Sequence, residues 1–250
     1  MNPLVLEKKA NDFRNVHGFG SNDSIRLKSL LYKLNVLTVF RPLSAGFSGM
    51  AIKVNNGQQV KRFVLINSSK TLGHQHFTIC HELYHLFIQE NFQSMVCSAG
   101  EFKKKDKEEY NADVFAAHLL LPENGIKSLI PDEELGKDKI KLRTILKIEQ
   151  YFSCSRAALL YRLKGLEIVT AKKLEEFNQN VKRSAVEFGY TTGIYEPGNH
   201  NEVIGDYGSL ARELFDNELI SESHYYSLLL DLGMNSQEIE EIEEIDDGEE

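Results

Sequence analysis

Hydrophobic positions in the first 34 residues recur at helical intervals. Leu27, Leu30, Leu31 and Leu34 stand at i, i+3, i+4 and i+7, which places them on one face of a helix. Polar residues at 22–24 offer a cap for its start. We therefore predict that residues 1–34 are helical.

The pattern then changes to that of strands. Residues 36–40, 50–54 and 60–66 are rich in β-branched and apolar side chains. Asn55-Asn56-Gly57 separates the last two runs, and Asn-Gly favours the tight turn of a hairpin. We expect a small antiparallel sheet.

Helical periodicity returns in two segments, 75–89 and 108–121, the second of which ends at Pro122. In the first helix the apolar face includes Ile79, Leu83 and Leu86. The opposite side of this helix carries Thr78, His81, His85 and Gln89, and we expect it to face away from the core.

Two further helical pairs are predicted toward the C-terminus. Residues 139–163 form two short helical patterns broken at 152–155, which is the geometry of a helix-turn-helix. Because this pair has no clear basic recognition face, two packed helices without a DNA role are favoured over a DNA-binding regulator. Residues 207–232 are helical in two pieces around 217–221, and no clear pattern places residues 166–200.

Charge is distributed unevenly along the 250 residues. The net charge is −8, but residues 238–250 contain nine acids and no lysine or arginine, so the remaining chain stands at +1. Such a tail is usually solvated and disordered. Neither part has the strong basic excess of a nucleic-acid binder, and we expect no direct contact with nucleic acid.

Compartment and redox state follow from what the sequence lacks. Its start has no long apolar run of the secretory type, and no stretch is long and apolar enough for a membrane span. Cys80, Cys97 and Cys154 are an odd number without CxxC spacing, which favours reduced thiols. A cytoplasmic protein without membrane contact is expected.

The strongest chemical signal is His81-Glu82-Leu83-Tyr84-His85, which matches H-E-x-x-H. Residues four apart lie on one helix face, so two imidazoles can share one cation. Glu82 projects close to that face and can accept a proton from an activated water. The sequence therefore predicts Zn²⁺ bound by His81 and His85, with Glu82 as general base, although Mn or Fe can occupy similar ligands.

A catalytic zinc requires a third protein ligand, and the 108–121 helix offers one. Glu109 and Asp113 are four apart and share a face. This resembles the E-x-x-x-D arrangement of gluzincin metallopeptidases. The resemblance implies that Glu109 binds the metal and that Asp113 orients a ligand histidine from the second shell of the site.

Longer segments resemble the ImmA/IrrE metallopeptidase family, over about residues 25–165. The matching runs are FTICHELYHL (77–86), EYNADVFAA (109–117), LLLP (119–122), GFSGMA (46–51), LIN (65–67) and SRAALLYRL (155–163). The sequence departs from the family pattern at Tyr84, where a small residue is usual, and a phenol there is expected to crowd the helix packing or narrow the cleft. His74 and His76 stand where arginines are frequent in the family, and we favour surface residues near the start of the helix over a metal or substrate role for them.

The resemblance implies an α+β fold, mostly helical. A small antiparallel sheet would pack on a zincin-type active-site helix, and a helical C-terminal region would follow. We accordingly divide the chain into a zincin-like catalytic domain (1–125), a helix-turn-helix-like segment (126–165), a C-terminal helical region (166–235) and an acidic, disordered tail (236–250).

The resemblance also implies a function. Such proteins are zinc endopeptidases of narrow specificity that cleave or inactivate a helix-turn-helix repressor encoded nearby, in stress responses, mobile elements or toxin–antitoxin-like systems. No fused repressor is recognised in the sequence, so this partner would act in trans. The alternative is a zinc-containing binding module that sequesters such a repressor without proteolysis.

Overall fold

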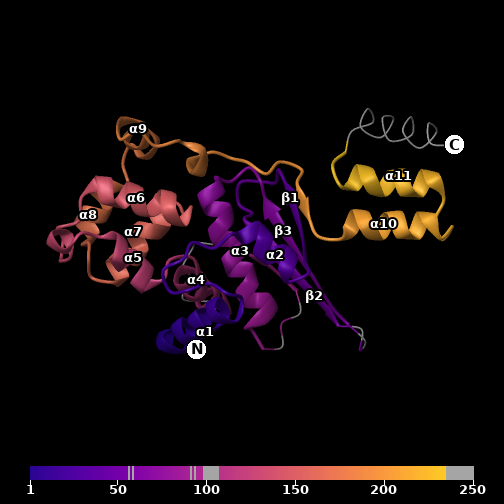
Figure 1. The fold of residues 1–250 in the computed structure, drawn as a ribbon, viewed down its shortest axis with the longest axis horizontal. Coiled ribbons are helices and arrows are strands. Elements are labelled where there is room, and N and C mark those ends of the chain that lie inside the picture. The colour runs from indigo at the N-terminus through magenta and orange to yellow at the C-terminus, as the bar shows by residue number, and fades with distance from the viewer. Residues whose placement is uncertain (56, 58, 91, 93, 98–106, 235–250) are drawn as a thin grey trace.

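The chain is described here from a computed structural model, which covers residues 1–234 except 56, 58, 91, 93 and 98–106, and the backbone alone at 94–97. The predicted acidic tail (236–250) and the side chain of Cys97 lie outside the described residues. Figure 1 shows the arrangement of the elements.

The elements follow one another in this order: α1 (Pro3–Val16), α2 (Leu27–Lys33), β1 (Val36–Arg41), β2 (Gly49–Asn55), β3 (Val60–Asn67), α3 (Leu72–Phe87), β4 (Ser94–Cys97), α4 (Lys107–Leu120), α5 (Glu123–Leu129), the 3₁₀ turn η1 (Asp132–Glu134), α6 (Leu142–Phe152), α7 (Arg156–Gly165), α8 (Ala171–Phe177), α9 (Val181–Glu187), the 3₁₀ turn η2 (Gly193–Tyr195), β5 (Val203–Ile204), α10 (Tyr207–Asp216) and α11 (Glu222–Asp231). The α+β class and the mostly helical content are confirmed.

The sheet is mixed, with strand order β4-β2-β3-β1-β5. β2 and β3 form the predicted antiparallel hairpin. The expectation of a wholly antiparallel sheet is wrong, because β1 pairs with β3 in parallel, from Val36 opposite Arg62 to Arg41 opposite Asn67. The physical reason is the connection at 42–48, which crosses the end of β3 and brings the chain back down as β2 on the other side.

Helix α3 lies between two layers of the fold. One side packs on strands β2 and β3, another packs on α4, and α4 is in turn covered by α1. All residues from Phe77 to Leu86 are buried. The prediction that the His81 side faces away from the core is therefore wrong, because that side faces α4. The sequence pattern could not indicate this, because buried polar side chains look the same in the pattern as polar side chains exposed to solvent.

The helical pair predicted over 139–163 is present as α6 and α7. Ser153 takes a left-handed conformation (φ 51°) that ends α6, and Ser155 caps α7 by accepting a hydrogen bond from Ala158 N at 3.2 Å. Arg156 and Glu149 form a buried ion pair between the two helices. Both helices contribute to the main core, which also contains residues of α1–α4.

The C-terminal region returns to the sheet. β5 pairs antiparallel with β1 at Thr38 and Val39. Just before it, Glu196 O accepts a hydrogen bond from Leu72 N at 2.8 Å, at the start of α3. Helices α10 and α11 then form a hairpin with its own small core, set beside the sheet (Figure 1). Among the described residues, no helix combines the length and apolar character that crossing a bilayer demands.

Candidate metal centre

Three side chains converge between α3 and α4. His81 and His85 stand one turn apart on α3, and their Nε2 atoms are 3.1 Å from each other. Glu109, in the first turn of α4, places one carboxylate oxygen 3.3 Å from His81 Nε2 and the other 3.4 Å from His85 Nε2. The structure thus brings together the three residues that the sequence predicts as ligands.

These separations fit a bound metal. A tetrahedral zinc with bonds of about 2.0–2.1 Å to nitrogen and oxygen has ligand atoms about 3.3 Å apart. The 3.1 Å between the two Nε2 atoms is close to one edge of such a tetrahedron, and each Nε2 has an oxygen of the Glu109 carboxylate at a similar distance, 3.3 Å for His81 and 3.4 Å for His85. A metal held by these three residues would keep a fourth position for water or substrate.

The outer nitrogens of the imidazoles fix their tautomers. His81 Nδ1 lies 2.9 Å from Asp113 Oδ1, and His85 Nδ1 lies 2.5 Å from Gln89 Oε1. Because both partner atoms only accept hydrogen bonds, each Nδ1 carries the proton and donates it. In the neutral rings both Nε2 lone pairs then point at each other and at the Glu109 carboxylate, an arrangement that a cation stabilises.

Asp113 therefore lies where the resemblance implies. Gln89 is a further partner of the site that the sequence interpretation did not assign. Its spacing of four residues from His85 was the available signal, since such residues are neighbours on a helix. Hydrogen bonds of this kind orient the ligands and raise their basicity.

The electrostatic surroundings of His81 and Glu109 also favour a positive charge between them. Burial opposes the charged form of His81, but hydrogen bonds to Asp113 and Glu109 outweigh it and raise the pKa of His81 to about 10. Burial also opposes the charged form of Glu109 and by itself would raise the pKa of this carboxyl. The hydrogen bonds and charges of the two imidazoles outweigh burial and hold the pKa of Glu109 well below its usual value. Without a metal, a proton occupies part of this cation site.

Glu82 is fully buried beside the ligands. Its charge acts on His81, and the start of β2 lies close against it. A Cβ at Gly49 would come within 2.9 Å of Glu82 Oε1 and 2.6 Å of Thr78 Cγ2, so only glycine lets the strand approach this closely.

Tyr84 is buried between α3 and α4. Its ring is buried against Phe115, with ring centroids 5.7 Å apart, and its hydroxyl donates to Glu108 Oε2 at 2.6 Å. The phenol therefore fills space between α3 and α4, and its polar end is paired with a carboxylate.

Two further histidines of α3 contact groups of the protein itself. His74 and His76 are half-buried, which corrects their expected surface placement: His74 Nε2 contacts Ser48 Oγ at 3.1 Å, and His76 Nδ1 contacts Ser153 O at 2.7 Å. Cys80 is buried in the core, and burial raises the pKa of its thiol to about 12.

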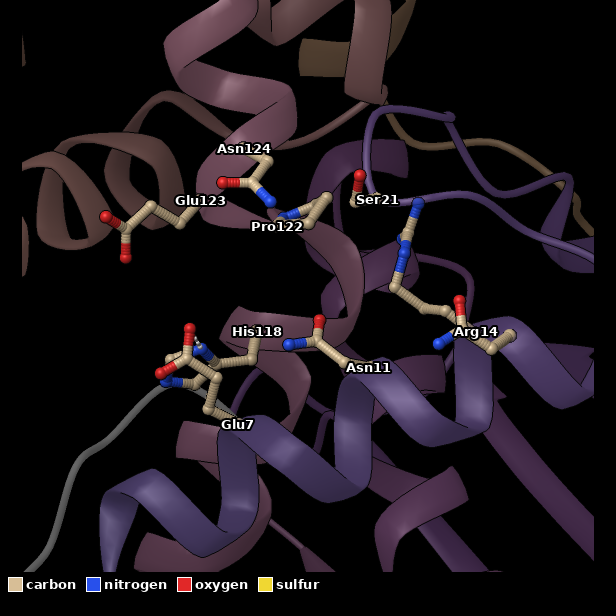
Figure 2. Close-up of a pocket in the computed structure, with 9 residues that line it drawn as sticks. Glu7, Asn11, Arg14, Ser21, His118, Pro122, Glu123 and Asn124 are labelled. Carbon is tan, nitrogen blue, oxygen red and sulfur yellow. Dashed lines mark ion pairs between the residues drawn. The ribbon is translucent and has the colours of Figure 1, made fainter.

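A second concavity, of about 470 Å³, lies between α1 and the start of α5 and contains none of the predicted ligands (Figure 2). Its polar groups contact other groups of the protein: His118 Nδ1 accepts a hydrogen bond from the Arg162 guanidinium at 3.1 Å and lies 3.6 Å from Glu7 Oε1, and the Arg14 guanidinium donates to main-chain carbonyls, including Leu119 O at 2.6 Å. These contacts join α1 and α4, and they give His118 a structural place between α4, α1 and α7.

The fold and site have the features of a metallopeptidase: an H-E-x-x-H helix beside a small sheet, with a carboxylate contributed by a following helix. Two comparisons agree. The model of peptidase family M78, the IrrE N-terminal-like domain, matches residues 33–164. The metallopeptidase ImmA of Bacillus subtilis (strain 168) is 33% identical over 67 residues, which are 27% of this chain and 40% of that protein. The chain belongs to the M78 metallopeptidase family, and the resemblance drawn from its motifs is confirmed.

Proposed function

We propose that this protein is a zinc-dependent endopeptidase of narrow specificity, with His81, His85 and Glu109 as ligands and Glu82 as general base. The observation that supports it most is the convergence of two Nδ1-protonated imidazoles and one carboxylate within 3.1–3.4 Å of one another. A zinc ion held there supplies Lewis-acid activation of water and of the scissile carbonyl.

The chain's own groups divide the remaining work. Glu82 accepts the proton of the attacking water and passes it to the leaving amine. Asp113 and Gln89 keep the imidazole rings oriented and their tautomers fixed. Because Glu82 is buried, its carboxylate acts in a water-poor environment where charge interactions are strong.

The proposed substrate is a protein acting in trans, a helix-turn-helix repressor encoded nearby. The support is the family resemblance together with the similarity to a protein named metallopeptidase ImmA. A cytoplasmic setting agrees with the free, buried thiols of Cys80 and Cys154.

The test compares Glu82→Gln with the parent protein and with Glu90→Gln. Glu90 is an exposed residue just beyond α3, so the control makes the same charge change outside the ligand cluster. With zinc and the neighbouring repressor, the parent and Glu90→Gln should yield fragments, while Glu82→Gln should bind zinc normally and yield none. Cleavage by Glu82→Gln at the parental rate contradicts the assigned general base.

The same experiment distinguishes the alternative, a binding module that sequesters the repressor. The close approach of Gly49 to a fully buried Glu82 is the observation that favours it, because such enclosure restricts access to the base. A repressor that stays intact in a stable complex with the zinc-loaded parent supports the module and refutes the peptidase.

A further inference from the structure

The connection between β1 and β2 creates a local hydrogen-bonding problem. These two strands flank β3, so residues 42–48 must cross the end of β3. The crossing loop turns main-chain carbonyls inward, where β-ladder partners are absent. Buried carbonyls need donors, and the last residue of β3 is the side chain best placed to supply them.

That residue is Asn67, whose side chain is fully buried. Its Nδ2 donates to Phe47 O at 2.7 Å, Ser44 O at 2.9 Å and Leu43 O at 3.3 Å. Its Oδ1 accepts from Leu43 N at 3.0 Å. One amide thus satisfies both ends of the loop and fastens them to the sheet.

The far end of this loop lies against the active-site helix. Ser48 O accepts a hydrogen bond from Asn67 N at 2.9 Å, and Ser48 Oγ contacts His74 Nε2 at 3.1 Å. Gly49 follows directly and lies so close to Glu82 that a Cβ would come within 2.9 Å of Oε1. The loop held by Asn67 therefore ends in the wall that borders the carboxylate of Glu82.

We propose that Asn67 is a positioning residue for Glu82: by fastening residues 43–48 to the end of β3, it holds Gly49 against the Glu82 carboxylate and so sets the orientation of the general base. This inference rests on the proposed function, because it assigns Asn67 a part in the work of Glu82. It goes beyond the ligand set, since Asn67 lies on a different element from every proposed ligand.

The side-chain chemistry at position 67 is demanding. Aspartate has the same shape but lacks the donors that three carbonyls require. Alanine leaves those carbonyls without their donor and a space at the end of β3, so the loop can move away from α3. Substitution at Gly49 perturbs the same contact from the other side, by pushing a methyl group toward Thr78 and Glu82.

The experiment uses full-length parent, Asn67→Ala, Gly49→Ala and a control, Val64→Ala. Val64 is a fully buried residue of β3 that pairs with Ala51, so its truncation perturbs the same sheet outside the 43–48 loop. Thermal stability, zinc affinity by chelator competition, and kcat and KM on a fluorescence-quenched peptide selected with the parent are measured.

If Asn67 acts through Glu82, Asn67→Ala and Gly49→Ala should keep zinc affinity and KM and lose about 10²-fold in kcat, as a misplacement of about 1 Å would produce. Val64→Ala should lose a similar amount of thermal stability but keep the parental kcat. A kcat that follows thermal stability in all three variants overturns the proposal.

The two hypotheses can fail separately. If the parent hydrolyses no peptide, the proposed function fails, and crystal structures of the zinc-loaded parent and Asn67→Ala decide the inference. A Glu82 carboxylate displaced in Asn67→Ala supports the positioning role. A carboxylate in the parental place, with the 43–48 loop moved, refutes it.

Discussion

Replacement of Asp113 is expected to weaken metal binding without unfolding the protein. Its carboxylate accepts the Nδ1 proton of His81 at 2.9 Å, and both side chains are buried. Loss of such a partner typically costs about 10- to 100-fold in metal affinity, or about 1.4–2.7 kcal/mol. Asp113→Asn, which keeps an acceptor but removes the charge, should lie near the lower value, and Asp113→Ala near the upper one.

The assay is competition for zinc against a fluorescent chelator of known affinity, at several pH values. The affinity of the parent should fall as pH decreases, because the pKa of metal-free His81 is raised to about 10 and the metal must displace that proton. Removal of Asp113 lowers that pKa, so the variants should show a shallower pH dependence.

The matched control is Gln89→Ala, which removes the neutral partner of His85. Its effect should be smaller than that of Asp113→Ala, because a neutral amide stabilises the imidazole less than a carboxylate does. Parental zinc affinity in Asp113→Ala, or a larger loss of affinity in Gln89→Ala, would refute the role assigned to the hydrogen bonds that Asp113 and Gln89 accept from the imidazoles.

Three further predictions concern stability. Tyr84→Phe should lower the free energy of unfolding by about 1.5–3 kcal/mol in urea titrations, because a hydrogen bond to a carboxylate on α4 is lost; an unchanged midpoint contradicts this. Arg156→Met should lower the free energy of unfolding by about 3–5 kcal/mol, because it leaves Glu149 buried without its ion pair, and zinc affinity should stay unchanged. A loss of less than about 1 kcal/mol, which is typical of exposed ion pairs, would show that the pair is not buried in solution. A chain that ends at residue 205 should fold and bind zinc, whereas a chain that ends at residue 195 should have a lower melting temperature because it lacks β5. Equal melting temperatures of the two chains would refute a structural role for β5.

Local patterns in the sequence were sufficient for most of the helices. The 3.6-residue spacing of apolar side chains predicted α2, α3, α4 and the pairs α6–α7 and α10–α11, because that spacing reflects hydrogen bonds within each segment. The hairpin of β2 and β3 was equally local, since Asn55-Asn56-Gly57 favours its turn. The two candidate metal ligands on α3 were predicted from a four-residue spacing on one helix face.

Other features depended on contacts between distant segments. The parallel pairing of β1 with β3 and the return of residues 203–204 as β5 have no local signature, because parallel neighbours and edge strands are chosen by packing of the whole sheet. The packing of α4 on α3 could not be predicted from the amphipathic pattern of α3, because the side of α3 that contacts α4 carries buried polar residues.

The sequence by itself determined which residues could hold a metal: His81 and His85 by their spacing, and Glu109 by its place on a second helix. Only the tertiary structure decided their convergence, the direction of Tyr84, the contact of Gln89 with His85 and the hydrogen bonds of Asn67 to the loop between β1 and β2. The physical reason is that ligand identity depends on side-chain chemistry along one helix, whereas orientation depends on how separate elements pack and which buried polar groups each must satisfy.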